Sequence, residues 1–416
     1  MISRKMIPLI LSFLFLVACN PGRGITPSAE AGTAVEMPAT FPSASDASSF
    51  TAESSPAVPP STATSTPTVT SAAPTPDWEE KSRLVDALFA SYGVGQSPGG
   101  AVIVIQDGKI LHEAGYGLAN LAVGTPITPS HIFHLASVGK QFTAWSVLML
   151  RDQGKLNLDD PVGEYLPELA HFGGGVTIRR LLNHTSGMPD AYSGKLLDAL
   201  MERSALPTNA DLLAVLSDAD ALRFTPGDKY EYSNTGYDVL GALIERVSGR
   251  PYPGFLEEHI FGPLEMENTF SLPSPRQKTD PLFVDSYVKY QGIIQTYDTY
   301  WLDDIVGSGT IYSSVEDLYR YDQALYTDAL IGHSSLAEAF QPAILNDGTE
   351  SPYGFGWELK TEGGQRSFAH AGKWLGYQSF YERFPDRQFS IVVLMNWNYG
   401  PAVEDVEASI REIYLK

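Results

Sequence analysis

Apolar and polar residues follow one another in patterns that predict helices and strands at both ends of one large folded region. The dipeptide Asp107-Gly108 separates two short runs of apolar residues, which is typical of a two-residue β-hairpin. Leu84, Leu88 and Phe89 recur at the spacing of one helical face. The predicted elements are a helix over 78–92, strands over 101–105, 109–112, 378–382 and 389–394, and a closing helix over 401–415.

The middle of the chain, about residues 140–350, has mostly helical patterns separated by long loops. The run from Phe142 to Leu150 is apolar almost all round, which predicts a helix buried inside a domain. We therefore predict an α/β (α+β) fold with an antiparallel sheet built from both chain ends, flanking helices and a mostly helical second lobe. This folded domain would comprise residues 77–416.

The first residues have the pattern of a secretory signal. Basic residues precede an apolar run over residues 6–18, which is too short for a comfortable membrane span. The run ends in Leu16-Val-Ala-Cys19, which resembles the bacterial lipoprotein signal. That resemblance implies that residues 1–18 are a signal peptide and that Cys19 becomes lipid-modified, which would anchor the protein to a membrane. The alternative is a buried or reactive thiol.

The segment after Cys19 is predicted to be a tether. Residues 20–76 consist mainly of Ser, Thr, Ala and Pro without a sustained apolar period, so they cannot bury enough surface to fold. Together with Cys19 they form a predicted lipidated spacer, residues 19–76, that lets the domain reach beyond the membrane. The chain has one cysteine, which excludes a disulfide within it.

Charge narrows the possible partners. The chain carries a formal charge of −21, of which residues 77–416 carry −20. An acidic domain of this kind repels nucleic acid, so we predict no nucleic-acid partner. The apolar content of 43% is ample for a large core.

The string Ser137-Val-Gly-Lys140 supplies a candidate nucleophile and base. A serine hydroxyl attacks a carbonyl only if a neighbouring group takes its proton. If Ser137 opens a helix, Lys140 lies about one turn along the same face, where burial would favour its neutral amine. A second such string, Ser286 to Lys289, lies in a stretch that favours strand or loop, so we discount it.

Two later strings carry groups that this chemistry uses, Tyr232-Ser-Asn234 and His370-Ala-Gly372. Tyr232 offers a phenolic oxygen that a nearby ammonium would make acidic enough to share in proton transfer. Asn234 can donate to a substrate carbonyl and accept from a lysine. Gly372 suits a strand edge that approaches a substrate closely.

With these strings in this order, residues from about 78 to 416 resemble the serine beta-lactamase-related superfamily. That group contains class C beta-lactamases, penicillin-binding D,D-peptidases, D-aminopeptidases and related esterases, and its beta-lactamase/transpeptidase fold agrees with the predicted architecture. Further segments that resemble the family are residues 181–189, 232–241, 308–318 and 353–357.

The resemblance implies a role for each candidate. Ser137 would be acylated, while Lys140 and Tyr232 share general acid and base duty. The oxyanion hole would consist of the backbone N–H groups of Ser137 and Lys373. Asn234, His370 and Gly372 would shape the substrate side.

His370 is the main departure from the beta-lactamase pattern. Typical beta-lactamases have a lysine at this position that helps to hold a carboxylate, and a neutral imidazole would hold one poorly. Histidine here resembles the D,D-peptidase, D-aminopeptidase and esterase branches. We therefore predict a serine hydrolase that forms an acyl-enzyme on a small ester, amide or peptide. The alternatives are a beta-lactamase or D-Ala-D-Ala carboxypeptidase, and a catalytically idle lipoprotein that binds peptidoglycan or peptide.

Neither a metal nor a cofactor is predicted. His131 and His134 have a spacing that could suggest a metal, but no third ligand follows. The predicted partners are the small substrate and, through Cys19, a membrane. The predicted location is extracytoplasmic, at the cell surface or in the periplasm.

Overall fold

The computed structural model describes residues 77–90, 97–277, 279–297 and 301–415. The predicted signal peptide, Cys19 and the tether lie outside the described residues. Among the helices that are described, none combines the length and the apolar composition needed to cross a bilayer.

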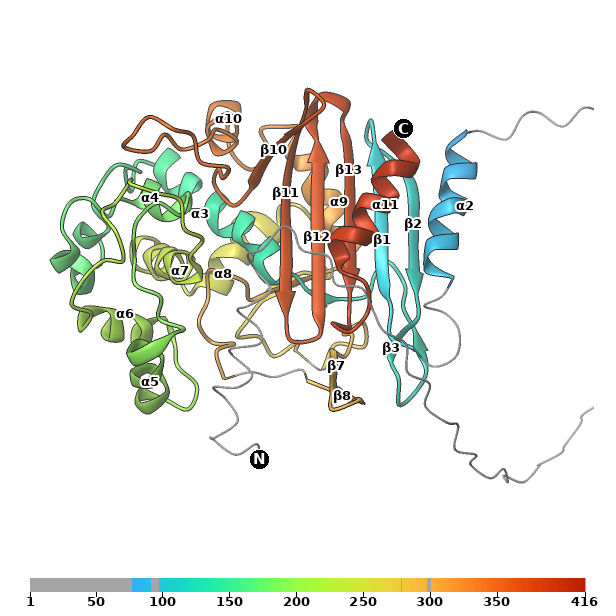
Figure 1. The fold of residues 1–416 in the computed structure, drawn as a ribbon, viewed down its shortest axis with the longest axis horizontal. Coiled ribbons are helices and arrows are strands. Elements are labelled where there is room, and N and C mark those ends of the chain that lie inside the picture. The colour runs from blue at the N-terminus through green and yellow to red at the C-terminus, as the bar shows by residue number, and fades with distance from the viewer. Residues whose placement is uncertain (1–76, 91–96, 278, 298–300, 416) are drawn as a thin grey trace, which may run out of the picture. The chain divides into compact units, whose positions relative to one another are not determined.

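One six-stranded antiparallel sheet joins the two ends of the domain (Figure 1). Its spatial order is β10-β11-β12-β13-β1-β2, so the first described strand pairs with the last, from Gly100 opposite Met395 to Gln106 opposite Phe389. The turn between β1 and β2 places Asp107 at a φ of 51° and Gly108 at 72°, as the hairpin signal predicted. The strands are β1 Gly100–Gln106, β2 Lys109–Tyr116, β10 Glu358–Glu362, β11 Gln365–Trp374, β12 Tyr377–Phe384 and β13 Phe389–Met395.

The two faces of the sheet bury different cores because side chains alternate along each strand. Val102 and Val104 face α2 (Asp77–Phe89) and α11 (Val403–Leu415), which cover one side of the sheet. Ile103 and Ile105 belong to the larger core, which also includes α9 (Val315–Ala324) and the helical lobe. The sheet therefore separates the terminal helices from the rest of the domain.

Helices dominate the second lobe, as the sequence predicted, and the structure adds short strands that the sequence did not predict. Its helices are α3 Lys140–Asp152, α4 Ile178–Leu182, α5 Gly194–Arg203, α6 Asn209–Ser217, α7 Asn234–Ser248, α8 Tyr252–Leu256 and α10 His333–Ala339. The shorter strands are β3 Leu118–Asn120, β4 Thr125–Pro126, β5 Phe133–His134, β6 Phe270–Ser271, β7 Tyr287–Tyr290, β8 Ile293–Thr296 and β9 Ile311–Ser313. Short turns are η1 Ala136–Gly139, η2 Val162–Glu164, η3 Pro167–Phe172, η4 Glu257–Phe261 and η5 Pro385–Arg387.

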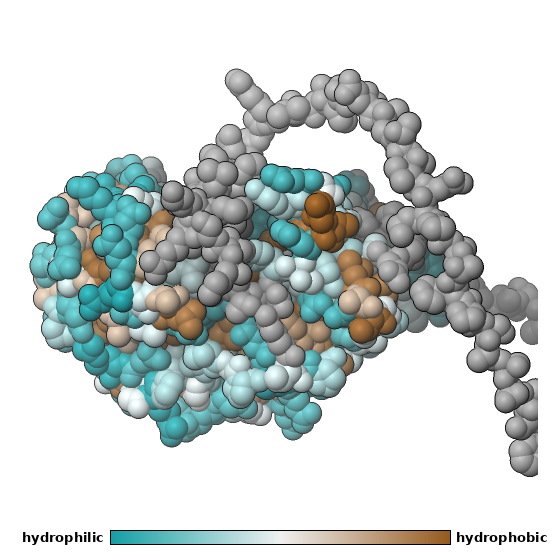
Figure 2. Space-filling view, turned by 90° about the horizontal axis from the view of Figure 1, so that it is seen from below, coloured by the Kyte–Doolittle hydropathy of each residue, from teal (hydrophilic) through white to brown (hydrophobic). Residues whose placement is uncertain are grey.

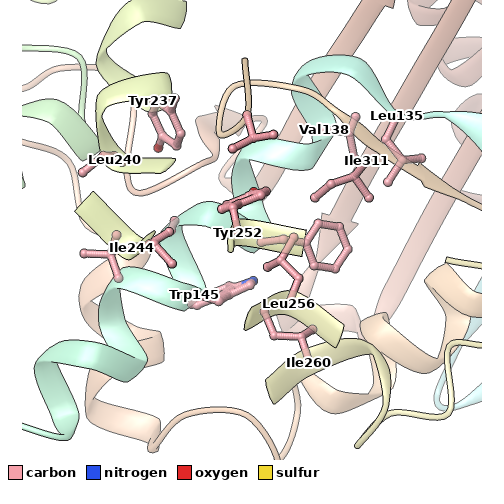
Figure 3. Packing of buried hydrophobic residues seen from close by; sticks show 14 of the residues in the cluster. Leu135, Val138, Trp145, Tyr237, Leu240, Ile244, Tyr252, Leu256, Ile260 and Ile311 are labelled. Atoms are coloured by element: carbon pink, nitrogen blue, oxygen red, sulfur yellow. The ribbon is translucent and has the colours of Figure 1, made fainter. Parts of the chain in front are cut away.

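Helix α3 lies in the middle of this lobe and is buried on every side (Figure 3). Its Trp145 packs in the same apolar cluster as Ile244 of α7 and Leu256 of α8, and the Trp145 indole donates to the Tyr321 hydroxyl. This packing confirms the buried helix predicted from the run between Phe142 and Leu150. It also fixes the first residue of α3, Lys140, deep inside the protein.

A hairpin formed by β7 and β8 lies at the lower end of the domain in Figure 1. Ser286, just before β7, is buried, and its Oγ accepts a hydrogen bond from the Gly376 backbone N–H at 2.9 Å. Lys289 lies within β7, so the second Ser-x-x-Lys string leads into a strand, in agreement with the predicted strand or loop. Figure 2 views the domain from this end and shows separate apolar groups on a largely hydrophilic visible surface; exposed Ile293 and Ile294 belong to the hairpin tip.

Candidate active site

Ser137 lies in a tight turn between β5 and α3. The preceding residue, Ala136, has a φ of 48°, in the left-handed region that costs a non-glycine residue conformational energy. His134 supports this turn, because its Nδ1 accepts a hydrogen bond from the Ala136 backbone N–H at 2.9 Å. Burial lowers the pKa of His134 to about 3, which keeps the ring neutral and able to accept. The sequence had suggested at most a metal ligand at His134.

Lys140, three residues later, directs its amine at three oxygen atoms. Its Nζ lies 3.1 Å from Ser137 Oγ, 2.8 Å from Asn234 Oδ1 and 2.6 Å from the Ser308 carbonyl oxygen. The two latter oxygens can only accept hydrogen bonds. In a neutral amine both hydrogens are therefore used by Asn234 and Ser308, and the lone pair is left to face the Ser137 hydroxyl.

The surroundings of Lys140 favour that neutral amine. The side chain is fully buried, and desolvation lowers its pKa to about 7, against the opposing effect of the nearby Asp238 carboxylate. A base with a pKa close to neutrality is well matched to accept the proton of a serine hydroxyl. The predicted burial of Lys140 is confirmed, and this burial lowers its pKa in the predicted direction.

Tyr232 lies against the same amine, but its acidity differs from the prediction. The Lys140 Nζ is 5.0 Å from the centre of the Tyr232 ring. Burial raises the pKa of Tyr232 well above its ordinary value, and the adjacent Ser137 hydroxyl lowers it only in part. The phenol is thus protonated and, within the described residues, has no hydrogen bond of good geometry. This arrangement leaves Lys140 as the better base and Tyr232 as a proton donor.

Asn234 is held in place by the start of α7. The Ser233 hydroxyl caps the helix by accepting from the Gly236 backbone N–H at 3.0 Å. The Ser233 backbone N–H in turn donates to His184 Nδ1 at 3.1 Å. Burial lowers the pKa of His184 well below its ordinary value, so it accepts as a neutral ring. His184 therefore fixes this loop through a hydrogen bond with the Ser233 backbone.

Gly372 lets β11 approach the turn that carries Ser137. A Cβ on Gly372 would lie 2.3 Å from both the Leu135 carbonyl oxygen and the Ser379 hydroxyl, so no side chain fits there. The Ser379 hydroxyl also donates to the Leu135 carbonyl at 2.6 Å. Strand β10 pairs with β11 only as far as Ala369, and the next part of β11 packs against η1.

The side chain of His370 lies at this site, whereas the side chain of Lys373 points to the other face of the sheet. Both ring nitrogens of buried His370 are engaged: Nδ1 lies 2.7 Å from the Ala371 carbonyl oxygen, and Nε2 lies 2.8 Å from the Tyr353 hydroxyl. Burial and the Lys140 charge lower the pKa of His370 to about 3, so it carries no positive charge. The side chain of Lys373 forms an ion pair with Glu404 of α11 at 2.9 Å, on the opposite face of the sheet.

Two functional neighbours were not identified from the sequence. The Ser308 carbonyl oxygen accepts from Lys140, and the buried Asp238 carboxylate accepts from the Ser308 backbone N–H at 2.9 Å. Both residues lie in segments that resemble the family, but neither belongs to the three short strings that carry the candidate residues. A carboxylate in the otherwise apolar run of α7 was the available signal.

The site is formed by side chains and backbone, without a candidate metal cluster. In residues 77–90, 97–277, 279–297 and 301–415 no three histidine, cysteine or acidic side chains are grouped to hold an ion. His131 Nδ1 instead accepts from the Thr128 backbone N–H at 3.0 Å. The candidate lipidation residue, Cys19, lies outside the described residues.

Comparisons with known proteins agree with this geometry. A model of the beta-lactamase family matches residues 85–415. Penicillin-binding protein 4* of Bacillus subtilis is 34% identical over 330 residues, which cover 76% of this chain and 72% of that protein. A D-aminopeptidase of Gluconobacter oxydans is 27% identical over 316 residues, which cover 76% of this chain and 58% of the longer relative.

Among solved structures, the octameric penicillin-binding protein homologue from Pyrococcus abyssi has a similar fold. It superimposes with a TM-score of 0.68 at 25% sequence identity, over 81% of this chain and 76% of that one. The predicted fold, an antiparallel sheet from both chain ends with helices, is confirmed.

Proposed function

Because the chain belongs to the beta-lactamase family and is a serine hydrolase, we propose that it cleaves small esters or amides through an acyl-enzyme on Ser137. The preferred substrates lack a carboxylate next to the scissile bond and include amides and peptides of D-amino acids. The similarity to a D-aminopeptidase supports this class of substrate. The match covers 58% of that relative, so we infer from it the class of substrate and not its complete activity.

The contacts of Lys140 Nζ carry this proposal, since they leave a lone pair for the proton of Ser137. As that proton moves to Nζ, Ser137 Oγ bonds to the substrate carbonyl carbon and the carbonyl oxygen becomes negative. The backbone N–H groups of Ser137 and Lys373 are the proposed donors to this oxyanion. The proton then passes from Lys140, with Tyr232, to the leaving group as its bond breaks. Water releases the acid and restores Ser137.

The charges around β11 support substrates without a carboxylate. A penicillin or a D-Ala-D-Ala terminus presents a carboxylate beside the bond to be cleaved. His370 is neutral, and the Lys373 ammonium is engaged with Glu404 on the other face of the sheet. A carboxylate placed here would lose water without gaining an ion pair from either residue.

A penicillin-sensitive D-Ala-D-Ala carboxypeptidase or beta-lactamase is the second candidate. The identity of 34% to a penicillin-binding protein favours it. A catalytically idle protein that binds peptidoglycan or peptide is a third candidate from another class. The lone pair that Lys140 presents to Ser137 argues against an idle site.

Two substrates that differ only in charge distinguish these candidates. We expect the purified full-length protein to cleave N-acetyl-D-Ala-D-Ala amide with a higher kcat/KM than the same dipeptide with a free carboxylate. The difference should be about tenfold or more, since an unpaired buried charge costs about 1.4 kcal/mol or more. Ser137→Ala is the control and should cleave neither.

Equal or faster cleavage of the free acid would favour the carboxypeptidase. No cleavage of either dipeptide, together with no hydrolysis of a simple p-nitrophenyl ester, would favour the idle binding protein.

We also propose that the protein is a lipoprotein anchored to the membrane through Cys19, with an extracytoplasmic domain. The apolar run before Leu16-Val-Ala-Cys19 and the Pro- and Ser-rich residues 20–76 support this. A tethered hydrolase of this kind would act on substrates near the cell envelope.

A further inference from the structure

Asp238 is a fully buried carboxylate one helical turn after Asn234 in α7. Its Oδ1 accepts a hydrogen bond from the Ser308 backbone N–H at 2.9 Å, and its Oδ2 accepts one from the Tyr192 hydroxyl. A buried carboxylate costs free energy unless its surroundings compensate the charge. The charge of Lys140, which lies across the Ser308 peptide, helps to compensate it.

The backbone between Asp238 and Lys140 is fixed from several sides. The Asn209 amide accepts from the Val306 N–H at 2.7 Å and donates to the Val306 carbonyl at 2.9 Å. The Thr143 hydroxyl donates to the Gly307 carbonyl at 2.6 Å. Gly307 has a φ of 124°, and a Cβ there would lie 2.2 Å from the Tyr237 carbonyl. These contacts hold the segment 306–308 with the Ser308 carbonyl directed at Lys140.

We infer that Asp238 is a positioning residue of the active site: through the Ser308 peptide and its own buried charge, it orients the Lys140 amine and governs when that amine gives up its proton. This inference rests on the proposed roles of Ser137 and Lys140. Asp238 does not touch the substrate. It acts on Lys140, which in turn acts on Ser137.

The two ionisable groups shift one another in opposite directions. The Asp238 carboxylate raises the pKa of Lys140, which desolvation otherwise lowers to about 7. Burial raises the pKa of Asp238 to about 6, while the hydrogen bonds from Tyr192 and Ser308 and the Lys140 charge lower it. Lys140 therefore titrates where a hydrolase works, and its titration depends on the state of Asp238.

The other ionisable groups around Lys140 and Asp238 are uncharged or more distant, so they do not replace the negative charge of Asp238. Burial keeps the two histidines near Lys140 neutral and the neighbouring tyrosines protonated. The groups facing Lys140 are His184, His370, Tyr232 and Tyr237, and those near Asp238 are Tyr192, Tyr252 and, beyond Tyr192, Asp190.

The variant Asp238→Asn isolates the charge. Asparagine has the same shape, and its carbonyl can still accept from the Ser308 N–H. Loss of the negative charge should lower the pKa of Lys140, because a nearby opposite charge stabilises the ammonium. The acidic limb of the pH profile for fluorophosphonate modification of Ser137 should then move to lower pH by about one unit or more.

Tyr192→Phe gives a second test of the same charge. Loss of the tyrosine hydrogen bond raises the pKa of Asp238, so that the carboxyl is neutral over more of the pH range. The acidic limb should move in the same direction as in Asp238→Asn, by a smaller amount. Asp190→Asn, which removes a neighbouring carboxylate that accepts from the Tyr192 backbone N–H at 3.0 Å, is the matched control and should not move the limb.

A direct measurement of Lys140 separates this inference from the proposed function. The protein is labelled with [ε-13C]lysine, and the Lys140 signal is assigned by its loss in Lys140→Met. The pKa from this signal should be lower in Asp238→Asn than in the wild type. An unchanged pKa, or a lower modification rate with an unmoved acidic limb, would overturn the inference and leave Asp238 a structural residue. If Ser137→Ala is still modified, the proposed function fails, while the lysine titration still decides the role of Asp238.

Discussion

At the scale of residues, the hydrogen bonds of the Lys140 amine determine that it acts as the base for Ser137. Both hydrogens of its neutral form have fixed acceptors, so its basic electron pair faces Ser137. The sequence indicated that Ser137, Lys140, Tyr232 and Asn234 would meet, because short strings carry them. It did not indicate the Ser308 carbonyl, since any residue type can present a backbone oxygen.

The conformation of the turn before Ser137 could not be predicted from the sequence. A positive φ at a glycine is expected, but Ala136 gives no such signal. The conformation depends on the His134 ring, which accepts from the Ala136 backbone, and on Gly309, where a Cβ would lie 2.9 Å from the Ala136 carbonyl carbon. These partners come from β5 and the segment before β9. Only the assembled fold brings them together.

Gly372→Ala should impair the site by pushing β11 away from the Ser137 turn. The new methyl group would meet the Leu135 carbonyl and the Ser379 hydroxyl at 2.3 Å. We expect fluorophosphonate modification to slow by about 100-fold, as when one oxyanion donor is lost. Overpacking should also lower stability by about 1 to 3 kcal/mol, measured as a lower Tm.

Gly254→Ala is the matched control for this change. Gly254 is exposed in α8 and has open space where a Cβ would be, so both the rate and the Tm should stay near wild type. A normal rate in Gly372→Ala would show that β11 need not approach Ser137 so closely.

At the scale of elements, strands β1 and β13 and the closing helix α11 were predicted from the sequence, because each has a clear apolar pattern, whereas the pairing of β1 with β13 required the structure. The small sheet β5-β9-β6 was not, since two- and three-residue strands have too few positions to show a period. Helix α11 also buries a carboxyl group on the face that packs against the sheet. Its buried Glu407 lies against the sheet close to buried Glu382 of β12.

These two carboxyls are poorly compensated. Arg411 Nε lies 3.6 Å from Glu407 Oε1 and 3.7 Å from Glu382 Oε2, whereas its Nη1 is 2.9 Å from exposed Glu362. The Ser367 hydroxyl donates to Glu382 at 2.7 Å. Burial and the Glu382 charge raise the pKa of Glu407 to about 9, and Arg411 and Lys360 lower it only in part.

Glu407→Gln should therefore stabilise the domain, increasingly so as the pH rises. In the unfolded chain Glu407 loses its proton near the ordinary glutamate pKa of 4.5, but in the folded protein it keeps it up to about pH 9. The wild-type protein loses stability across this window, because the folded state binds more protons. Glutamine cannot ionise and removes that loss.

Thermal unfolding at pH 5 and pH 8 tests this prediction. The gain at pH 8 should be about 1 to 3 kcal/mol and should be smaller at pH 5. Glu404→Gln on the same helix, whose partner is Lys373 near the surface, is the matched control and should not stabilise the domain at pH 8. A destabilised Glu407→Gln at pH 8 would mean that the charged form of Glu407 holds α11 in place.

For the whole molecule, composition excluded partners better than it identified a substrate. A charge of −20 on residues 77–416 argues against nucleic acid. Substrate choice depends on loops and on the surroundings of His370, and one fold serves many substrates. The neutrality of His370 could be suspected from its residue type, but its hydrogen bond with Tyr353 required the structure.

The proposed anchor gives a prediction at the same scale. Cells that express the protein are grown with radiolabelled palmitate. The wild type should incorporate the label and Cys19→Ser should not, because Cys19 is the single cysteine of the chain. Ser137→Ala should be labelled like the wild type, since it leaves the signal intact. Absence of label from the wild type would contradict the lipoprotein proposal, without bearing on the hydrolase.

Intact mass spectrometry after incubation with a fluorophosphonate shows whether Ser137 is the nucleophile of this hydrolase. The wild-type protein should gain the mass of one phosphonyl group and Ser137→Ala should gain none. Ser286→Ala, which changes the serine of the second Ser-x-x-Lys string, should gain one group like the wild type. An adduct that persists in Ser137→Ala, or a wild-type protein that gains no mass, would show that Ser137 is not the nucleophile.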